Sequence, residues 1–321
     1  MRCRSRCGMI ELAPNKRPVI CGFAASLGER REIVANAADG LSEAAYSVLR
    51  ATGLQYYRVV DDLEPHVLNV ITASLARADI TPEAVDCVII ATKRDYPGAE
   101  AMNRDIQEVL VNAGITGATI FGLDRIACAN AVLAMCLGNM LVSQGTFRNC
   151  LVLSYNKMRP EESRLMKPTV GYLSEGAAAC VVTSATRRGY HIGTPAIQSD
   201  LMLDDQSAQN DLLATFRAIG KNVRGLGERF YQSHNMTPGD YRIMIMNNLS
   251  FSTMRLFSGQ MDIPWSIVYK DLVSETSHIS GCDVIANLEH IDAHQPDLID
   301  GPALIFSNSA IDWVVTELTR C

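Results

Sequence analysis

The sequence predicts a layered α/β fold, in which helices pack against mostly buried strands. Hydrophobic residues make up 48% of the 321 residues and charged residues 20%, so the chain can bury a large core. Strand-like and helix-like stretches alternate along the first half, and the second half follows a similar plan. In addition, residues 128–145 are almost wholly apolar, which predicts a helix inside the molecule.

The elements of the first half follow from its hydrophobic pattern. Apolar runs predict strands at residues 17–22, 85–92, 118–123 and 149–154, the first ending at Gly22. Residues 171–182 are expected to form a glycine turn that leads into a strand of small residues. Apolar residues at helical spacing predict helices at residues 65–78, 103–113 and 128–145, with Gly114 closing the second. Strands separated by helices indicate layers of sheet and helix.

A polar stretch at residues 183–189 separates the two halves, which we place at residues 1–187 and 188–321. The second half opens with residues 190–198 and is expected to contain strands at 241–246 and 303–306. Helices are expected around residues 211–224 and from about residue 250.

The charge and hydropathy patterns exclude several classes of function. The formal net charge is −6, which argues against a surface that follows nucleic-acid phosphates. The chain has no uninterrupted apolar run of about 18 residues, the length needed to cross a bilayer, and no apolar segment follows its basic start. We therefore expect a cytoplasmic protein that binds neither nucleic acid nor membrane.

Ten cysteines and six histidines give no pattern typical of a metal site. Most of the cysteines lie in apolar runs, which indicates buried, reduced thiols. Cys3 and Cys7 are four residues apart, but no second pair follows at zinc-ligand spacing. His290 and His294 can share a helical face without a third ligand nearby, so we expect no metal ion.

The position of Cys128 suggests a nucleophile. It follows the strand at 118–123 and the connector at 124–127, and it begins the long buried helix. At a helix N-terminus the unpaired N–H groups and the helix dipole favour the thiolate, and the same N–H groups can stabilise an oxyanion. A small buried thiol at a helix start, similar to Cys136, remains an alternative, because chain order alone supplies no base.

Four segments resemble the ketoacyl-ACP synthase III enzymes of the thiolase superfamily. Residues 121–132, FGLDRIACANAV, are similar to the family's nucleophile elbow. The other similar segments are residues 80–92, residues 141–153 and the turn LSEGAAA at 173–179. The resemblance covers most of residues 17–315. It implies a thiolase fold, in which two similar α/β halves form a layered α-β-α-β-α structure with Cys128 between them, and it implies a homodimer.

Two positions depart from the family's pattern. The family's histidine follows a strand in a PHQAN-like motif, and the run IMNNLS at 245–250 puts Asn247 in its place. The family's later asparagine corresponds to His278, in a segment similar to the GHxxxxD form of divergent members, some of which transfer acyl groups. The resemblance thus implies Cys128 as nucleophile, His278 as base and Asp283 as the residue that orients it.

Other roles remain open for two of these residues. Asp283 can equally cap a helix or form a salt bridge, since side chains five residues apart meet only where the segment turns. Asn247 is expected to donate a hydrogen bond to the thioester carbonyl, or else to serve as a turn residue at the end of a strand. Residues 306–313 replace the family's glycine-rich loop, which implies an oxyanion hole formed by the N–H groups of Cys128 and Ser309.

The resulting hypothesis is an acyltransferase of specialised metabolism, for example of antibiotic biosynthesis. Cys128 would take an acyl group from an acyl-carrier-protein or CoA thioester, and His278 would activate a hydroxyl, amine or thiol of a small-molecule acceptor. We expect no bound cofactor, because acyl-CoA or acyl-phosphopantetheine would serve as the substrate carrier. Two alternatives remain: a decarboxylating condensing enzyme with the Asn247/His278 pair exchanged, and a non-catalytic partner subunit with the same fold.

Overall fold

The computed structural model describes residues 17–34, 41–92, 97–159, 162–166, 170–203 and 212–321. Ten strands form one sheet, five from each half of the chain. The strands of the first half lie in the order β5 (Thr119–Leu123), β4 (Cys87–Ala91), β6 (Asn149–Asn156), β9 (Gly176–Thr183) and β1 (Val19–Leu27). Parallel pairs join β4 to β5 and β6, whereas β9 runs antiparallel to both of its neighbours.

The second half continues the same sheet from the far edge of β1. Its strands are β10 (Tyr190–Ile192), β11 (Ala196–Ser199), β12 (Ile243–Ile245), β13 (Ala303–Asn308) and β14 (Asp312–Arg320). β14 pairs with β10, β11 and β13, and β12 lies parallel to β13. The two halves are joined by the pairing of Ile20 with Tyr190.

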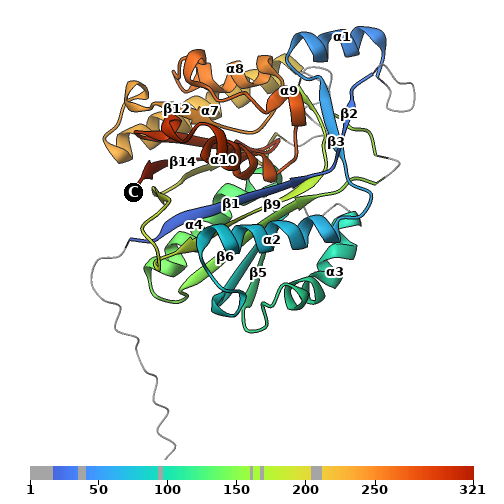
Figure 1. The fold of residues 1–321 in the computed structure, drawn as a ribbon. Coiled ribbons are helices and arrows are strands. Elements are labelled where there is room, and N and C mark those ends of the chain that lie inside the picture. Colours follow the sequence, from blue (N-terminus) through green and yellow to red (C-terminus); the bar gives the residue numbers. More distant parts are fainter. Residues whose placement is uncertain (1–16, 35–40, 93–96, 160–161, 167–169, 204–211) are drawn as a thin grey trace, which may run out of the picture.

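In the described parts of the chain, six longer helices complete the layers (Figure 1). The helices α2 (Glu64–Ala78) and α3 (Pro97–Asn112) cover the outer face of the first half, where α2 packs along β1 and β9. The helices α7 (Leu212–His234) and α8 (Phe251–Gln260) cover the outer face of the second half. Between the halves lie α4 (Asn130–Ser143) and α10 (Cys282–His294), which share a hydrophobic core with strands of both. The α-β-α-β-α layering predicted from the sequence is therefore confirmed.

Alternation along the strands explains why each sheet face has a core of its own. On β4, Ile89 faces the central helices and Val88 faces α2 and α3. On β13, Ile305 faces the central helices and Leu304 faces α7 and α8. Strands buried on both faces read as continuous apolar runs, which is why the sequence predicts them well.

Smaller elements connect these layers. The short helices are α1 (Glu43–Ala51) and α9 (Val273–Thr276), and the short strands are β2 (Glu29–Glu32), β3 (Tyr56–Val59), β7 (Leu165–Met166) and β8 (Gly171–Tyr172). Single 3₁₀ turns occur at η1 (Pro82–Ala84), η2 (Ala127–Ala129), η3 (Pro238–Asp240), η4 (Trp265–Ile267) and η5 (Pro296–Ile299). Among the residues described, every helix is too short or too polar to cross a bilayer.

Four expectations from the sequence need correction. The first strand does not end at Gly22, because that glycine takes a φ of 64° and forms a bulge, after which β1 continues to Leu27. The helix expected at 128–145 starts with the 3₁₀ turn η2, so the α-helical part is α4 alone. α7 extends ten residues beyond the expected 224, to His234. Residues 312–320 form β14, a strand the sequence analysis missed.

Gly22 offers a test of the bulge. A Cβ atom there would clash with the backbone carbonyl oxygen of Ser74, and the positive φ disfavours any side chain. We expect Gly22→Ala to lower the free energy of unfolding by about 2–3 kcal/mol in denaturant titrations. Gly259→Ala is the matched control, because Gly259 is an exposed position of helix α8 where an added Cβ would meet no other atom. That change should leave stability unchanged or raise it by up to about 1 kcal/mol.

Candidate active site

Cys128 lies in the 3₁₀ turn η2, between the end of β5 and the start of α4. Asn130 fixes this turn, because its side chain accepts a hydrogen bond from the Ile126 N–H at 3.2 Å and donates one to the Thr92 carbonyl at 2.9 Å. The preceding residue, Ala127, has a φ of 42°, which is unusual for a residue with a side chain. No described residue accepts a hydrogen bond from the Cys128 N–H, so this donor is free to bind a ligand oxygen.

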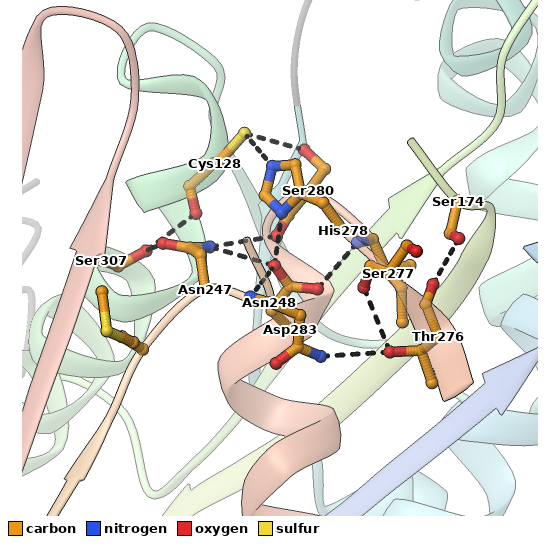
Figure 2. Close-up of polar contacts among 12 residues, drawn as sticks. Cys128, Ser174, Asn247, Asn248, Thr276, Ser277, His278, Ser280, Asp283 and Ser307 are labelled. Carbon is orange, nitrogen blue, oxygen red and sulfur yellow. Dashed lines mark hydrogen bonds and ion pairs between the residues drawn. The ribbon is translucent and has the colours of Figure 1, made fainter. Parts of the chain in front are cut away.

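His278 meets Cys128 across the boundary between the two halves (Figure 2). Its Nε2 lies 3.2 Å from the Cys128 Sγ, and its Nδ1 lies 2.5 Å from the Asp283 Oδ2. The backbone of His278 is held by the first half: its N–H donates to the Tyr172 carbonyl at 3.0 Å, and its carbonyl accepts from the Ser174 N–H at 2.8 Å. The turn at 171–176 thus positions the imidazole.

Asp283 lies in the first turn of α10 and is fully buried. Its Oδ1 accepts from the Ile279 N–H at 2.7 Å, and its Oδ2 accepts from the Asn248 N–H at 2.9 Å. The segment between His278 and Asp283 turns sharply, with Ser280 at a φ of 58°, so side chains five residues apart meet. Asp283 therefore holds the imidazole and does not form a side-chain cap on α10.

Asn247 lies behind this chain of hydrogen bonds and is fully buried. Its side-chain carbonyl accepts from the Asn308 N–H at 3.0 Å and lies 2.9 Å from the Ser307 hydroxyl. Its amide nitrogen is 3.4 Å from the Asp283 Oδ2. The Ser307 hydroxyl is also 3.0 Å from the Cys128 carbonyl, as Figure 2 shows. Asn247 is not among the residues that line the cavity described next, so its expected hydrogen bond to a thioester carbonyl finds no support in this arrangement.

Cys128 and His278 open into a cavity of about 570 Å³ lined by residues of both halves. Its walls are mainly apolar: Leu165, Met166, Val170, Leu173, Leu203, Phe216, Ile219, Leu249, Leu256, Phe257 and Trp313. Ser309 lines the cavity as well, but its N–H donates to the Asp312 carbonyl at 2.8 Å. The predicted second oxyanion donor is therefore already paired, because residues 309–312 form the tight turn between β13 and β14.

The electrostatics of the site favour a thiolate beside an imidazolium. Burial raises the pKa of the Cys128 thiol, but the charge and hydrogen bond of His278 and the hydrogen bond of Ser280 outweigh it, so the pKa falls below its ordinary value. For His278, burial lowers the pKa, but Asp283 and the thiolate more than offset this effect and raise the pKa to about 10. The site thus shifts Cys128 toward its nucleophilic thiolate form.

The other buried thiols behave differently. Burial raises the pKa of Cys21, Cys136 and Cys282 to about 12, which leaves them protonated and unreactive. All eight cysteines that the structure describes are free thiols, whereas Cys3 and Cys7 lie outside the described residues. His290 and His294 stack with ring centroids 4.4 Å apart, and no three ligating side chains come together anywhere in the described ranges.

Sequence reasoning missed two polar side chains beside the nucleophile. The Ser280 hydroxyl lies 3.5 Å from the Cys128 Sγ, and Ser307 connects the Cys128 carbonyl to Asn247. Ser280 follows the expected base, His278, by two residues. A tight turn between them places both side chains beside the same sulfur. Ser307 lies in the segment 306–313, whose hydroxyl-bearing side chains were the signal in the sequence.

Comparisons with known proteins place the fold. No family model matches the sequence, and no curated protein matches it. Among solved structures, 3-oxoacyl-[acyl-carrier-protein] synthase III from Aquifex aeolicus VF5 superposes with a TM-score of 0.75 over 94% of this chain and 99% of that chain, at 16% identity. The chain has the thiolase fold. The resemblance to ketoacyl-ACP synthase III predicted from the sequence is confirmed at the level of fold.

Two further structures with this thiolase fold are equally similar. The synthase III of Pseudomonas aeruginosa PAO1 has a TM-score of 0.75 and 18% identity, over 95% of this chain and 98% of that one. ChlB3, described as an acyltransferase, has a TM-score of 0.75 and 13% identity, over 94% and 97%. At such low identity the likeness concerns the fold, so the chemistry must be argued from this chain's own residues.

The thiolate beside His278 predicts the pH dependence of alkylation. Because the pKa of Cys128 is lowered, the inflection in the pH profile of its reaction with iodoacetamide should lie below that of an ordinary thiol. In His278→Gln the charge is lost and burial dominates, so the inflection should move upward and the rate at pH 7 should fall at least about tenfold. Peptide mapping by mass spectrometry measures this rate at Cys128 alone.

His294→Gln is the matched control, since His294 is exposed and far along α10. Its profile should follow that of the unmodified protein. An inflection at the same pH in His278→Gln and in the unmodified protein would contradict the proposed ion pair.

Proposed function

We propose that this protein is an acyltransferase, in which Cys128 accepts an acyl group from a thioester and His278 activates a nucleophilic acceptor. The observation that supports it is the continuous chain from the Cys128 Sγ through the His278 imidazole to the Asp283 carboxylate, which opens into an apolar cavity. A thiolate, a base and a group that orients the base are the parts that acyl transfer requires.

In the first half-reaction the Cys128 thiolate attacks the thioester carbonyl. The free N–H of Cys128 then binds the oxyanion. The carrier sulfur leaves as a thiolate and takes a proton from the His278 imidazolium to become a thiol, and an acyl-Cys128 thioester remains. The apolar walls of the cavity suit the hydrocarbon part of an acyl group.

In the second half-reaction His278 acts as base. Its neutral Nε2 takes the proton of the acceptor while the acceptor attacks acyl-Cys128, and the sulfur leaves as a thiolate. Asp283 stabilises the imidazolium that forms, because its carboxylate lies against Nδ1 and is fixed by two backbone N–H groups. The resting ion pair is restored without any further group.

The environment of Asn247 favours acyl transfer over decarboxylative condensation. A condensing enzyme of this fold stabilises an enolate with two side-chain donors that face the substrate. Here Asn247 is turned toward Asp283, Asn308 and Ser307, so of the Asn247/His278 pair only His278 lines the cavity. One base beside the sulfur is what a transfer to an external acceptor needs.

The donor in this proposal is an acyl-carrier-protein or CoA thioester. A groove between α7 and α8 carries the exposed cations Arg217, Lys221 and Arg224, three to four residues apart on one helix face. It shares Phe216 and Leu256 with the wall of the catalytic cavity. Basic side chains at that place suit the phosphate groups of CoA or of a phosphopantetheine arm, and the acidic surface of a carrier protein.

A homodimer completes the proposal. β5 is an edge strand, and the side chains of Ile120 and Phe121 on it are exposed. An unpaired edge with apolar side chains is a surface that a second copy of the chain can cover. Because β5 leads directly into the turn of Cys128, such a dimer would also steady the nucleophile.

Intact-protein mass spectrometry tests the acyl-enzyme. After incubation with acyl-CoA thioesters of increasing chain length, the protein should gain the mass of one acyl group, and peptide mapping should place it on Cys128. Cys128→Ala should gain none. Cys321→Ala, which removes an exposed cysteine far from the cavity, should load normally.

Two outcomes would contradict this proposal. Release of carbon dioxide with a β-keto product, from acyl and malonyl thioesters together, would show a condensing enzyme. Absence of acylation with every thioester would favour a non-catalytic partner subunit.

Charge reversal on α7 tests the donor-binding groove. Arg217→Glu combined with Lys221→Glu should raise the KM for an acyl-carrier-protein or CoA donor about tenfold or more, with little change in kcat. The KM should also lose its dependence on salt. The control is Arg187→Glu, an exposed cation away from both cavities. An unchanged KM in the double variant for both donors would count against the groove.

A further inference from the structure

Ser280 contacts the reacting sulfur. Its hydroxyl donates to the Cys128 Sγ at 3.5 Å, and the Nε2 of His278 lies 3.2 Å from the same atom (Figure 2). Ser280 is 4% exposed, and its φ of 58° is one that residues with a side chain rarely adopt. A strained, buried hydroxyl against a nucleophile suggests a chemical role for this side chain.

Acylation of Cys128 changes what the Ser280 hydroxyl can bind. The thiolate is a strong acceptor because it carries a full charge, whereas the sulfur of a thioester is a weak one. Among the described residues, no other atom forms a hydrogen bond with the Ser280 Oγ. A buried hydroxyl without an acceptor is unfavourable. In acyl-Cys128 the Ser280 hydroxyl is therefore an unpaired donor beside the reacting carbon, and an incoming acceptor group can accept its hydrogen bond.

Ser280 is not among the residues that line the cavity, but its hydroxyl contacts the Cys128 Sγ directly. The acceptor must come close to that sulfur, because it attacks the carbonyl carbon bonded to the Sγ and gives its proton to the His278 Nε2. The oxygen of an alcohol has two lone pairs and one proton. It can attack with one lone pair, accept from Ser280 with the other and donate its proton to His278. The nitrogen of an amine has a single lone pair, which the attack uses, so it leaves the Ser280 hydroxyl unpaired.

We propose that Ser280 is a catalytic residue that hydrogen-bonds first the Cys128 thiolate and then the acceptor oxygen, and that the acceptor is an alcohol. This inference rests on the proposed acyl transfer. The acceptor oxygen forms a bond to the acyl carbon, and its proton moves to the His278 Nε2. The C–S bond breaks with its electron pair on the sulfur, which yields an ester and restores the thiolate beside the imidazolium. Ser280 then returns to the thiolate.

Small nucleophiles test the selectivity, because methanol and methylamine are close to water in size. Acyl-Cys128 is formed with an acyl-CoA, freed of excess donor, and its decay with water, methanol or methylamine is followed by intact mass. In Ser280→Gly, release by water and by methanol should slow about tenfold or more relative to the unmodified protein, whereas release by methylamine should stay within about twofold. Equal slowing with all three nucleophiles, or with none, would overturn the proposal.

Two variants separate the hydroxyl from the backbone. Ser280→Gly removes the hydroxyl and suits the positive φ, and Ser280→Ala removes it while keeping the strain. Both should show the same selectivity change. Ser277→Ala is the matched control, because Ser277 also has a positive φ but its hydroxyl donates to the Tyr56 carbonyl. Its ratio of methanol to methylamine release should equal that of the unmodified protein.

A second measurement does not depend on acyl transfer. The inflection in the pH profile of Cys128 alkylation should rise by about one unit in Ser280→Gly, since the thiolate loses one hydrogen bond. An unchanged inflection would contradict the contact between Ser280 and the sulfur. Failure of the unmodified protein to form any acyl-Cys128, together with a shifted inflection in Ser280→Gly, would instead contradict the acyltransferase proposal.

Discussion

The 3.2 Å contact between the Cys128 sulfur and the His278 imidazole constrains the whole arrangement, because its two partners come from different halves of the chain. Cys128 is placed by β5 and α4, and His278 by the segment between α9 and α10. Strand-like hydrogen bonds from Tyr172 and Ser174 to the backbone of His278 tie these two parts together. The large central core of α4 and α10 supplies the rigidity that such a contact requires.

The buried charge of Asp283 is tolerated because N–H donors surround its carboxylate. Asp283 accepts from Ile279, Asn248 and Asn247, and Asn248 in turn is bonded to Thr276 and Asn287. Removing one member of a buried ion pair leaves the other without compensation, which is far more harmful than the loss of a surface pair. This network therefore both stabilises the fold and orients the imidazole of His278, and Asn247 takes part in it through hydrogen bonds with Asp283 and Asn308.

The sequence predicts what depends on local pattern. Continuous apolar runs place β4, β6 and β9, helical spacing places α2, and Ser250 marks the start of α8, where it caps the helix. The pairing of Cys128 with His278 came from resemblance, since residues 150 apart carry no local signal of contact. What was missed depends on distant neighbours: the bulge at Gly22 follows from α2 beneath it, and β14 follows from its pairing with β13. The orientation of Asn247 follows from Ser307, which a glycine-rich loop would lack.

Three residues with side chains hold positive φ angles around the sulfur: Ala127, Ser277 and Ser280. Each of these conformations lowers the free energy of unfolding, and the packed layers on either side offset this loss. Substituting glycine at these positions is the obvious route to a more heat-resistant protein. The same change would make the loops that position Cys128 and His278 more flexible. Thermal stability and the rate of turnover would therefore change in opposite directions at these three positions.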